Sequence, residues 1–495
     1  MMSTLLNLKM AGLAAAQEAA DTDEGKSLVC VFLAGGMDSF NMLIPHEQSA
    51  YEAYASARGG YNSATDGVVG EFNPAVDPVT GAAALHLFRE GDSAYGDVQR
   101  ERQSLSLNHA DALLPAFGVH GACSKFQELY NGYGGDDTKR RLAFVSNVGT
   151  LIQPTTMTQY QNESVSLPKA LFSHSDQQEQ WMTSVPQGLT NLAGWGGRMA
   201  DILHSTHNVE PKTSMNISLG GNNIFQIGQD VQQFVISNSG ALTFSNEVNY
   251  EGNLGHTRGI KHGGADSLLA ATYRHQMEQA FASHTKASVE AQSYFQDEFD
   301  TEDTPSAFSG SLTWFERNLL AATKTIALRE KLGLKRQTIF IIYGGWDHHF
   351  ELIETQDSML NGLSEGLYKF QSALEEKGLA DSTVTFSATE FARTLRPNRA
   401  GTDHAWGGNQ FVMGGPVDGG KVFGTYPDLS IDGPDDVGRA GRMLPTLSAD
   451  EYFAELLRWF GVNSSTDLSY VLPNIGNFWE YNPNQMPVGF LNPQV

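Results

Sequence analysis

Carboxylate and imidazole side chains follow apolar runs at four places in the sequence. Asp38 comes after the first run, in Gly-Gly-Met-Asp, and Glu390 follows a later one. The other two places are the motifs Asp347-His348-His349 and Asp403-His404. Charged groups are costly to place at the ends of apolar strands unless they are paired or bind a metal. Asp, Glu and His also hold Zn²⁺ or Mn²⁺ where thiolates are absent. The pattern therefore predicts a divalent metal site, with zinc or manganese favoured and calcium as the alternative.

Each motif alone also has an ordinary structural explanation. Asp38 after two glycines, and Asp347 before a helical pattern, are both typical of helix N-caps. Glu390 and Arg393 fit a structural ion pair, and Asp403-His404 lies in a glycine-rich loop where both residue types serve turns. Because four such motifs follow separate strands or the loops after them, we favour metal binding over the structural explanations.

The elements that must position these residues are apolar runs that alternate with amphipathic segments. Continuous β-branched and aromatic hydrophobicity is typical of strands buried on both faces of a parallel sheet, and periods near 3.6 residues predict helices. Together they predict a doubly wound, mostly parallel α/β sheet sandwiched by helices, which binds ligands at the carboxyl ends of its strands. The predicted strands are residues 28–36, 142–149, 216–221, 338–345, 384–390 and 411–415, and the predicted helices include 123–130, 265–299, 312–332 and 350–377.

The chain is predicted to form one domain with insertions. Its 495 residues would allow two or three domains, but strands and helices alternate along the whole length without a fixed repeat. Residues 28–495 are therefore assigned to a single α/β domain with loop-rich insertions at about 50–108 and 245–264. The N-terminal segment 1–27 has a short apolar stretch, which fits either a degenerate export signal or a frayed amphipathic helix.

Composition excludes several classes of function. The formal net charge of −24 repels phosphate backbones, so we expect no nucleic-acid partner. No apolar stretch reaches the roughly 20 residues of a membrane span. Cys30 and Cys123 form no Cys-x-x-Cys pair, which excludes a thiolate zinc site. The Gly-rich motifs of nicotinamide, P-loop and serine-hydrolase enzymes are absent as well. Sequence alone leaves the oligomeric state open.

Together, the motifs resemble the bacterial "domain of unknown function 1501" family. The resemblance is carried by LAGGMDSFN, YGGWDHH, SATEFART and GTDHAWGG, and it extends over about residues 28–479. It implies an alkaline-phosphatase-like or sulfatase-like fold and, by analogy, a metal-dependent hydrolase of phosphate or sulfate esters. The substrate would be a small-molecule or glycan ester. The resemblance also favours a periplasmic or exported protein, although the sequence has no twin arginine and a cytoplasmic location stays open.

The resemblance also implies a set of metal ligands. Asp38 corresponds to the first metal carboxylate of the superfamily. Asp347 and His349 correspond to a second ligand group, in which His348 is the less favoured imidazole. His404 corresponds to the late metal histidine.

One position departs from the superfamily pattern. Glu390 stands where the superfamily has an Asp followed by a His, and here Phe391 takes the place of that imidazole. The departure permits a single-metal or altered centre. It also supports the alternative that the chain is a non-catalytic envelope or surface binding protein, with a structural cation or none.

The superfamily mechanism further requires a nucleophile at a helix N-terminus. Ser173 is the first candidate and Ser175 the second, although serine here is also typical of an N-cap. His174 would act as a ligand or as a proton donor to the leaving group. Arg393 and Asn41 are the candidates for holding the non-bridging oxygens of the ester. No Cys-x-Pro-x-Arg motif is present, so a formylglycine sulfatase mechanism is not supported.

Overall fold

A computed structural model describes most of the chain. The described residues are 25–59, 85–92, 96, 98–111, 113–188, 193–208, 210–242, 264, 267–398, 401–438 and 440–491. Residues 1–24 of the predicted N-terminal segment lie outside them, as do residues 60–84 of the first insertion and 245–263 of the second.

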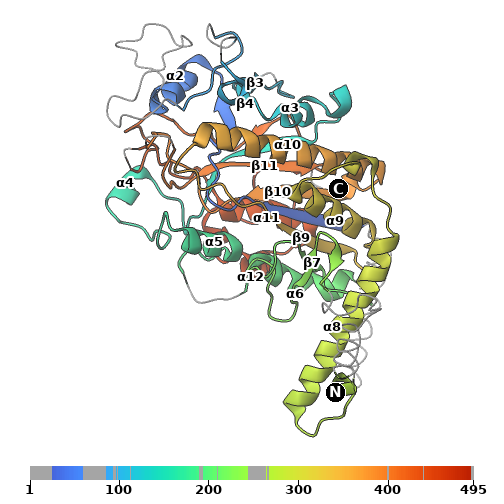
Figure 1. Cartoon of the computed structure of the whole chain (residues 1–495). Helices are drawn as coiled ribbons and strands as arrows, with labels where there is room; N and C mark the ends of the chain where they lie inside the picture. Colours follow the sequence, from blue (N-terminus) through green and yellow to red (C-terminus); the bar gives the residue numbers. More distant parts are fainter. Residues whose placement is uncertain are drawn as a thin grey trace.

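A large, mostly parallel β-sheet runs through the centre of the molecule (Figure 1). Its strands are β1 (Lys26–Phe32), β5 (Leu142–Gly149), β6 (Asn216–Ser218), β7 (Phe234–Ser237), β8 (Gly240–Ala241), β9 (Arg336–Ile342), β10 (Thr383–Ala388), β11 (Gly408–Gly414), β12 (Val422–Phe423) and β13 (Leu447–Ser448). They are arranged in the order β12-β5-β11-β10-β1-β9-β6-β7-β8, with β13 also paired to β5. This confirms the predicted mixed α/β class with a mostly parallel sheet.

The central strands are apolar because helices cover both of their faces. In β1, Cys30 pairs with Phe340 of β9 on one side and with Phe386 of β10 on the other, and all three are buried. The strand β11 is an exception to the predicted direction, since it runs antiparallel to both β10 and β5. A continuous apolar run indicates that a strand is buried on both faces of the sheet. An antiparallel strand at the centre of the sheet is buried in the same way, so its sequence shows the same pattern.

Helices lie on both faces of this sheet (Figure 1). The helix α10 packs against both α3 and α9 near one face, whereas α5, α6, α11 and α12 group near the other. None of the helices in the described part of the chain is long and apolar enough to cross a membrane. Their bounds are α2 (Gln48–Ala57), α3 (Ser124–Asn131), α4 (Met157–Gln161), α5 (His174–Thr183), α6 (Trp195–His207), α8 (Gln276–Thr301), α9 (Trp314–Ala327), α10 (Leu352–Glu376), α11 (Ala449–Phe460) and α12 (Ser465–Val471).

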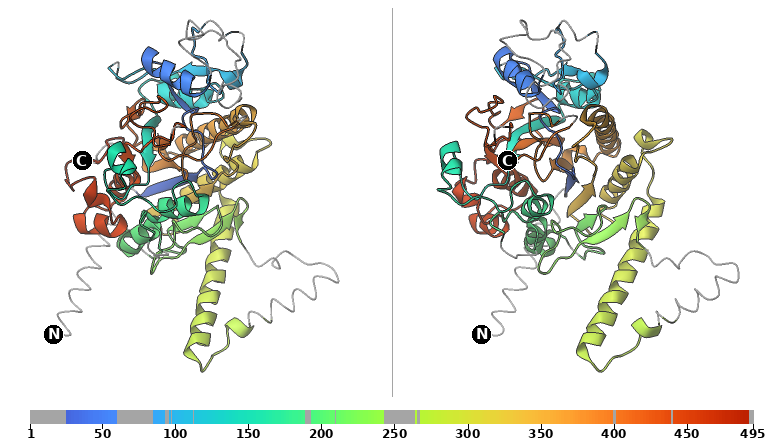
Figure 2. Two further views of the ribbon diagram at one scale, coloured as in Figure 1. Left: turned by 90° about the vertical axis from the view of Figure 1, so that its left-hand side faces the viewer. Right: turned by 60° about the vertical axis from the view of Figure 1, so that its left-hand side comes forward.

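Two segments differ from the sequence-based expectation. In place of one helix over 265–299, residues 267–269 are helical, residues 270–275 are not, and the long helix α8 begins at Gln276; α8 extends away from the rest of the molecule (Figure 2). The first insertion was expected to consist of loops, but its described parts also contain a helix and a strand. The helix α2 buries Tyr51 and Tyr54 in a separate apolar cluster. The strand β3 (Ser104–Ser106) joins β2 (Leu43–Pro45) and β4 (Phe117–His120) in a small antiparallel sheet.

A buried carboxyl group makes the contact between α5 and α11 sensitive to pH. Asp450 in the first turn of α11 is fully buried and accepts a hydrogen bond from the hydroxyl of Ser184, which follows α5. Burial raises the pKa of Asp450 to about 7 from its ordinary value of 3.8. A raised carboxyl pKa means that the folded state binds the proton more tightly, so stability falls as pH rises toward 7 and is constant above it.

We therefore expect the variant Asp450→Asn to lose less stability than the wild type between pH 5 and pH 7. The difference should grow by on the order of 1 kcal/mol for each pH unit in this window. Urea unfolding at pH 5, 6, 7 and 8 measures it. Parallel profiles for the two proteins would show that Asp450 does not titrate in this range.

Candidate metal centre

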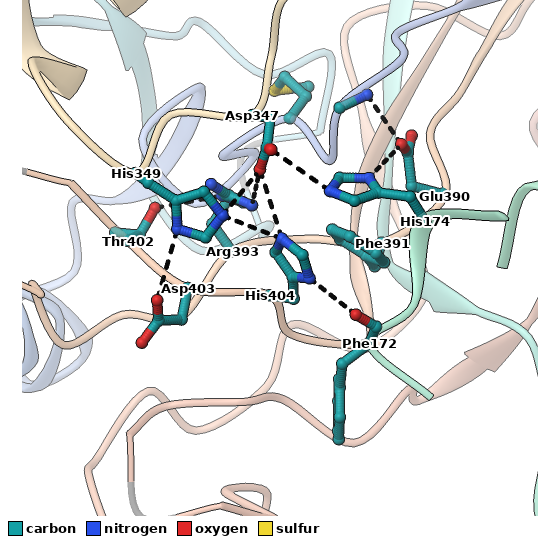
Figure 3. A network of polar contacts seen from close by, with 12 residues as sticks. Phe172, His174, Asp347, His349, Glu390, Phe391, Arg393, Thr402, Asp403 and His404 are labelled. Atoms are coloured by element: carbon teal, nitrogen blue, oxygen red, sulfur yellow. Dashed lines mark hydrogen bonds and ion pairs between the residues drawn. The ribbon is translucent and has the colours of Figure 1, made fainter. Parts of the chain in front are cut away.

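The sheet topology brings the predicted site residues to one edge. The strands β1, β9 and β10 are adjacent and parallel, so the segments that follow them, with Asp38, Asp347 and Glu390, begin at the same edge. Because β11 runs antiparallel to β10, the loop that leads into it returns His404 to this edge. The strand β5 also ends here, and the helix α5 that comes later contributes His174 (Figure 3).

Three imidazoles surround the carboxylate of Asp347. The Nε2 atom of His174 lies 3.4 Å from Oδ2, and those of His349 and His404 lie 3.0 and 3.3 Å from Oδ1. The Nε2 atoms of His349 and His404 are 3.1 Å apart. Tetrahedral zinc with bonds of about 2.0–2.1 Å places neighbouring ligand atoms about 3.3 Å apart. The distances from the Nε2 atoms to Asp347 are close to this spacing. The atoms offered by His174, Asp347 and His404 all lie within 4.8 Å of one another.

The hydrogen bond made by Nδ1 of His404, the ring nitrogen that faces away from Asp347, fixes the tautomer of this residue. Its Nδ1 donates to the main-chain carbonyl of Phe172 at 2.7 Å, and burial lowers the pKa of His404, which favours the neutral ring. The Nε2 lone pair then points toward Asp347. Phe172 has a φ of +74°, a strained conformation for a non-glycine residue. Arg442 holds this turn, since its guanidinium lies 4.6 Å from the centre of the Phe172 ring and its Nε donates to the carbonyl of His404.

His174 is held in the same way by Glu390. The Nδ1 atom of His174 lies 2.9 Å from Oε1 of Glu390, and this oxygen also accepts hydrogen bonds from Gly35 N and Gln178 Nε2. Glu390 is fully buried. A carboxylate on the outer nitrogen of an imidazole is the usual outer partner of a metal-binding histidine. Glu390, which the sequence places among the metal ligands, is therefore positioned instead to orient the ligand His174 through its outer nitrogen.

The third imidazole, His349, has a weaker outer contact. Its Nδ1 lies 3.5 Å from Oδ1 of Asp403, a half-exposed carboxylate. In the tautomer that carries its proton on Nδ1, each of the three Nε2 atoms would present a lone pair to the Asp347 carboxylate. Lone pairs and a carboxylate repel one another, and a cation between them removes that repulsion. The donor set thus fits a divalent metal.

Arg393 keeps Asp347 ionised. The guanidinium of Arg393 is fully buried, and it donates from Nη1 to Asp347 at 2.8 Å and from Nε to Thr402 at 3.4 Å. Burial alone would raise the pKa of Asp347, but the positive charge and the hydrogen bond of Arg393 hold it below its ordinary value. Arg393 is therefore paired with a member of the cluster and not with Glu390, the ion pair considered from the sequence.

Two predicted residues are engaged elsewhere. Asp38 forms an ion pair with Arg58 at 2.6 Å, and both side chains are fully buried. The amide of Asn41 donates to the carbonyl of Leu85 at 3.1 Å and accepts from the hydroxyl of Tyr54 at 2.8 Å. The partners of both residues come from the first insertion or its flanks.

The remaining predicted residues lie beside the cluster. His348 is buried, and burial lowers its pKa to about 4. Ser173 is the N-cap residue of α5, directly before His174, and its hydroxyl donates to the carboxylate of Asp176 at 2.6 Å. Ser175 Oγ lies 3.4 Å from the hydroxyl oxygen of Ser173.

Three partners of the site were not identified from the sequence. Gln178 lies four residues after His174 on α5, so helical spacing would have placed both on one face. Phe172 contributes its main-chain carbonyl, and a contact made by a main-chain atom cannot be predicted from residue types. Arg58 directly follows α2, in a segment that the sequence pattern assigned to loops.

The outer carboxylate provides a test of this geometry. In the variant Glu390→Gln, the amide oxygen can still accept from His174, but the negative charge is lost. We expect zinc affinity to fall by about 10- to 100-fold, as is typical for outer partners of metal ligands. Competition with a chromophoric chelator measures the affinity. The control is Glu375→Gln, which removes a carboxylate that pairs with Arg141 instead. Equal affinities of Glu390→Gln and the wild type would contradict the assignment.

Comparisons with known proteins give a family for the chain. The family model described as "Protein of unknown function (DUF1501)" matches residues 25–449. No curated protein matches the chain significantly. Among solved structures, the crystal structure of Ps i-CgsB is similar over 72% of this chain and 71% of that chain, with 10% identity and a TM-score of 0.30. Ps i-CgsB in complex with k-i-k-neocarrahexaose gives 9% identity with the same coverage and TM-score. Likeness at this level supports neither a fold assignment nor a function.

Proposed function

The chain belongs to the DUF1501 family, and from this premise and the geometry of the Asp347 cluster we propose a metal-dependent hydrolase of phosphate or sulfate esters with an alkaline-phosphatase-like fold. The observation that carries the proposal is the set of three imidazole Nε2 atoms around one carboxylate. Asp347 is 44% exposed, so a substrate can reach the cluster from solvent. Three nitrogen donors favour zinc or manganese over calcium, which prefers oxygen ligands.

The proposed metal ligands are Asp347, His174 and His404, with His349 as the fourth candidate. A bound ion would polarise an ester oxygen and offset the charge that develops on it. Arg393 positions Asp347 through its hydrogen bond, and Glu390 positions His174.

Ser173 is the proposed nucleophile. Its hydroxyl already donates to Asp176, which is placed to take the proton as Oγ attacks the phosphorus or sulfur atom. This attack forms a covalent ester on Ser173 as the bond to the alcohol oxygen of the substrate breaks. The departing alkoxide takes a proton from water, and a second water molecule then hydrolyses the ester. The N-terminal end of α5 favours the negative charge that builds up beside it.

The position of His349 favours a second candidate function, because its Nε2 atom lies 3.0 Å from Asp347 and 3.1 Å from the Nε2 atom of His404. If His349 binds together with the other three residues, four protein ligands fill a tetrahedral shell, which is typical of structural metal sites. The chain would then be a non-catalytic binding protein with a structural cation.

Hydrolysis assays on metal-reconstituted protein separate the two functions. The metal-free full chain is supplied with zinc, manganese or calcium and tested on aryl phosphates and aryl sulfates. We expect turnover with zinc or manganese and its loss in His404→Ala, whereas His284→Ala on the exposed face of α8 serves as the control. Tight zinc binding without turnover of either ester class would favour the structural cation.

A further inference from the structure

The helix α8 exposes two large apolar side chains on the part that extends away from the molecule (Figure 2). Met277 is 75% exposed and Phe281 is 72% exposed. Both belong to one strip of α8 whose members are spaced four and three residues apart, the pattern of a helix that packs along another helix. The first half of this strip faces solvent, whereas Phe295 in its second half is buried. The strip consists of Met277, Phe281, His284, Ser288, Ala291 and Phe295.

A groove of about 660 Å³ continues the exposed part of the strip toward the body of the protein. One of its walls is α8 itself, which is narrow here because Ala287, Ser288 and Ala291 have small side chains. The facing wall includes Phe234 of β7 and Leu242, which is 49% exposed. The same face of α8 is thus bulky near its N-terminal end and recessed about ten residues later.

The bulky and the recessed parts match each other in spacing. Phe281 follows Met277 by four residues, and Ala291 follows Ala287 by four. When two copies of α8 lie antiparallel with His284 at the centre, Met277 of each copy faces Ala291 of the other and Phe281 faces Ala287. A two-fold axis therefore fills both grooves at once, as a self-complementary interface requires. This register favours a second copy of the chain as the occupant of the groove.

The charge of the chain supports the same occupant over a lipid surface. The formal net charge of −24 repels anionic lipid headgroups. It also opposes contact between two copies through acidic surfaces. The six residues of the strip and Ala287 include no Asp, Glu, Lys or Arg, so this face can meet its own copy without burying a charge.

The area that such a contact would bury is close to that of known complexes. Each exposed Met277 or Phe281 side chain can cover about 100–180 Å². In two copies, these side chains and the surfaces beneath them amount to about 800–1,400 Å², and stable complexes bury about 1,200–2,000 Å². We therefore expect a dimer that dissociates in the micromolar range.

We propose that α8 is a dimerisation arm, through which two copies of the chain associate with antiparallel α8 helices around a two-fold axis at His284. The groove residues Ser214 and Gln233 lie just before the parallel strands β6 and β7. The interface is thus at the opposite edge of the sheet from the metal centre, and the inference goes beyond the proposed hydrolase activity.

Sedimentation equilibrium of the full chain at about 1–100 µM tests the association. We expect a monomer–dimer equilibrium, and we expect Phe281→Glu to raise the dissociation constant at least about 30-fold, as for a central interface residue. The control is Leu113→Glu, which places the same charge at another exposed leucine, outside α8. A wild type that stays monomeric up to 100 µM, including one that binds phosphatidylglycerol vesicles instead, would overturn the proposal. Equal dissociation constants for Phe281→Glu and the control would overturn it as well.

Disulfide cross-linking tests the antiparallel register. The native cysteines Cys30 and Cys123 are buried, so an added surface cysteine reacts on its own. We expect His284→Cys to form a disulfide between two copies, because this position meets itself at the axis. Ser288→Cys should not, since the two copies of this position lie eight residues, or about 12 Å, apart along the helices. Cross-linking of Ser288→Cys, or of neither variant, would contradict the proposed arrangement.

Discussion

Replacing Asp347 with asparagine is expected to lower zinc affinity on the order of a thousandfold, beyond the 10- to 100-fold typical of outer residues. Asp347 lies within 3.4 Å of an Nε2 atom from each of His174, His349 and His404, so its charge acts on every proposed imidazole ligand. The substitution also removes the charged partner of Arg393, which is fully buried. Titration calorimetry with zinc on the metal-free full chain measures the change.

The matched control for this experiment is Asp418→Asn. Asp418 is a partly exposed carboxylate that pairs with Lys421, and its loss should leave zinc affinity unchanged. If Asp347→Asn binds zinc as tightly as this control does, the three imidazoles do not share an ion with Asp347.

Replacing Ser173 with alanine is expected to lower ester turnover by about a thousandfold or more, because the covalent step would be lost. Zinc affinity should change little, since the hydroxyl contacts Asp176 and Ser175 and not the imidazoles. Stability should change little as well. Ser173 is the N-cap residue of α5, yet its side chain makes no capping hydrogen bond among the described residues.

Steady-state assays with the ester that the wild type hydrolyses provide the measurement for Ser173→Ala. The variant Ser175→Ala is the matched control, because it removes a neighbouring hydroxyl on the same turn and should keep turnover within a few-fold of the wild type. Unchanged turnover in Ser173→Ala would eliminate this residue as nucleophile.

The strands of the sheet could be predicted from the sequence because strands buried on both faces consist of continuous runs of apolar residues. The predicted run 142–149 coincides with β5, and the run at 384–390 contains most of β10. Asp347 and His404 were predicted to meet because strand ends in such sheets share an edge. The antiparallel direction of β11 could not be predicted, since a strand buried on both faces has the same composition in either direction.

The detailed roles of Asp38 and Glu390 depend on contacts between distant segments. Asp38 pairs with Arg58, which is 20 residues away in a segment of loop-like composition. Glu390 contacts His174, 216 residues earlier, and so lies outside the cluster that it supports. The sequence pattern identifies both as carboxylates at strand ends. Only the packing of the insertion and of α5 decides which groups face them.

One metal ion is expected between Asp347 and the imidazoles, and anomalous X-ray diffraction from zinc-loaded crystals locates it directly. We expect a single anomalous peak about 2.0–2.1 Å from the Nε2 atoms of His174 and His404 and about 2.0–2.2 Å from an oxygen of Asp347. A zinc-saturated crystal without a peak at this position, or with the peak bound to other residues, would contradict it.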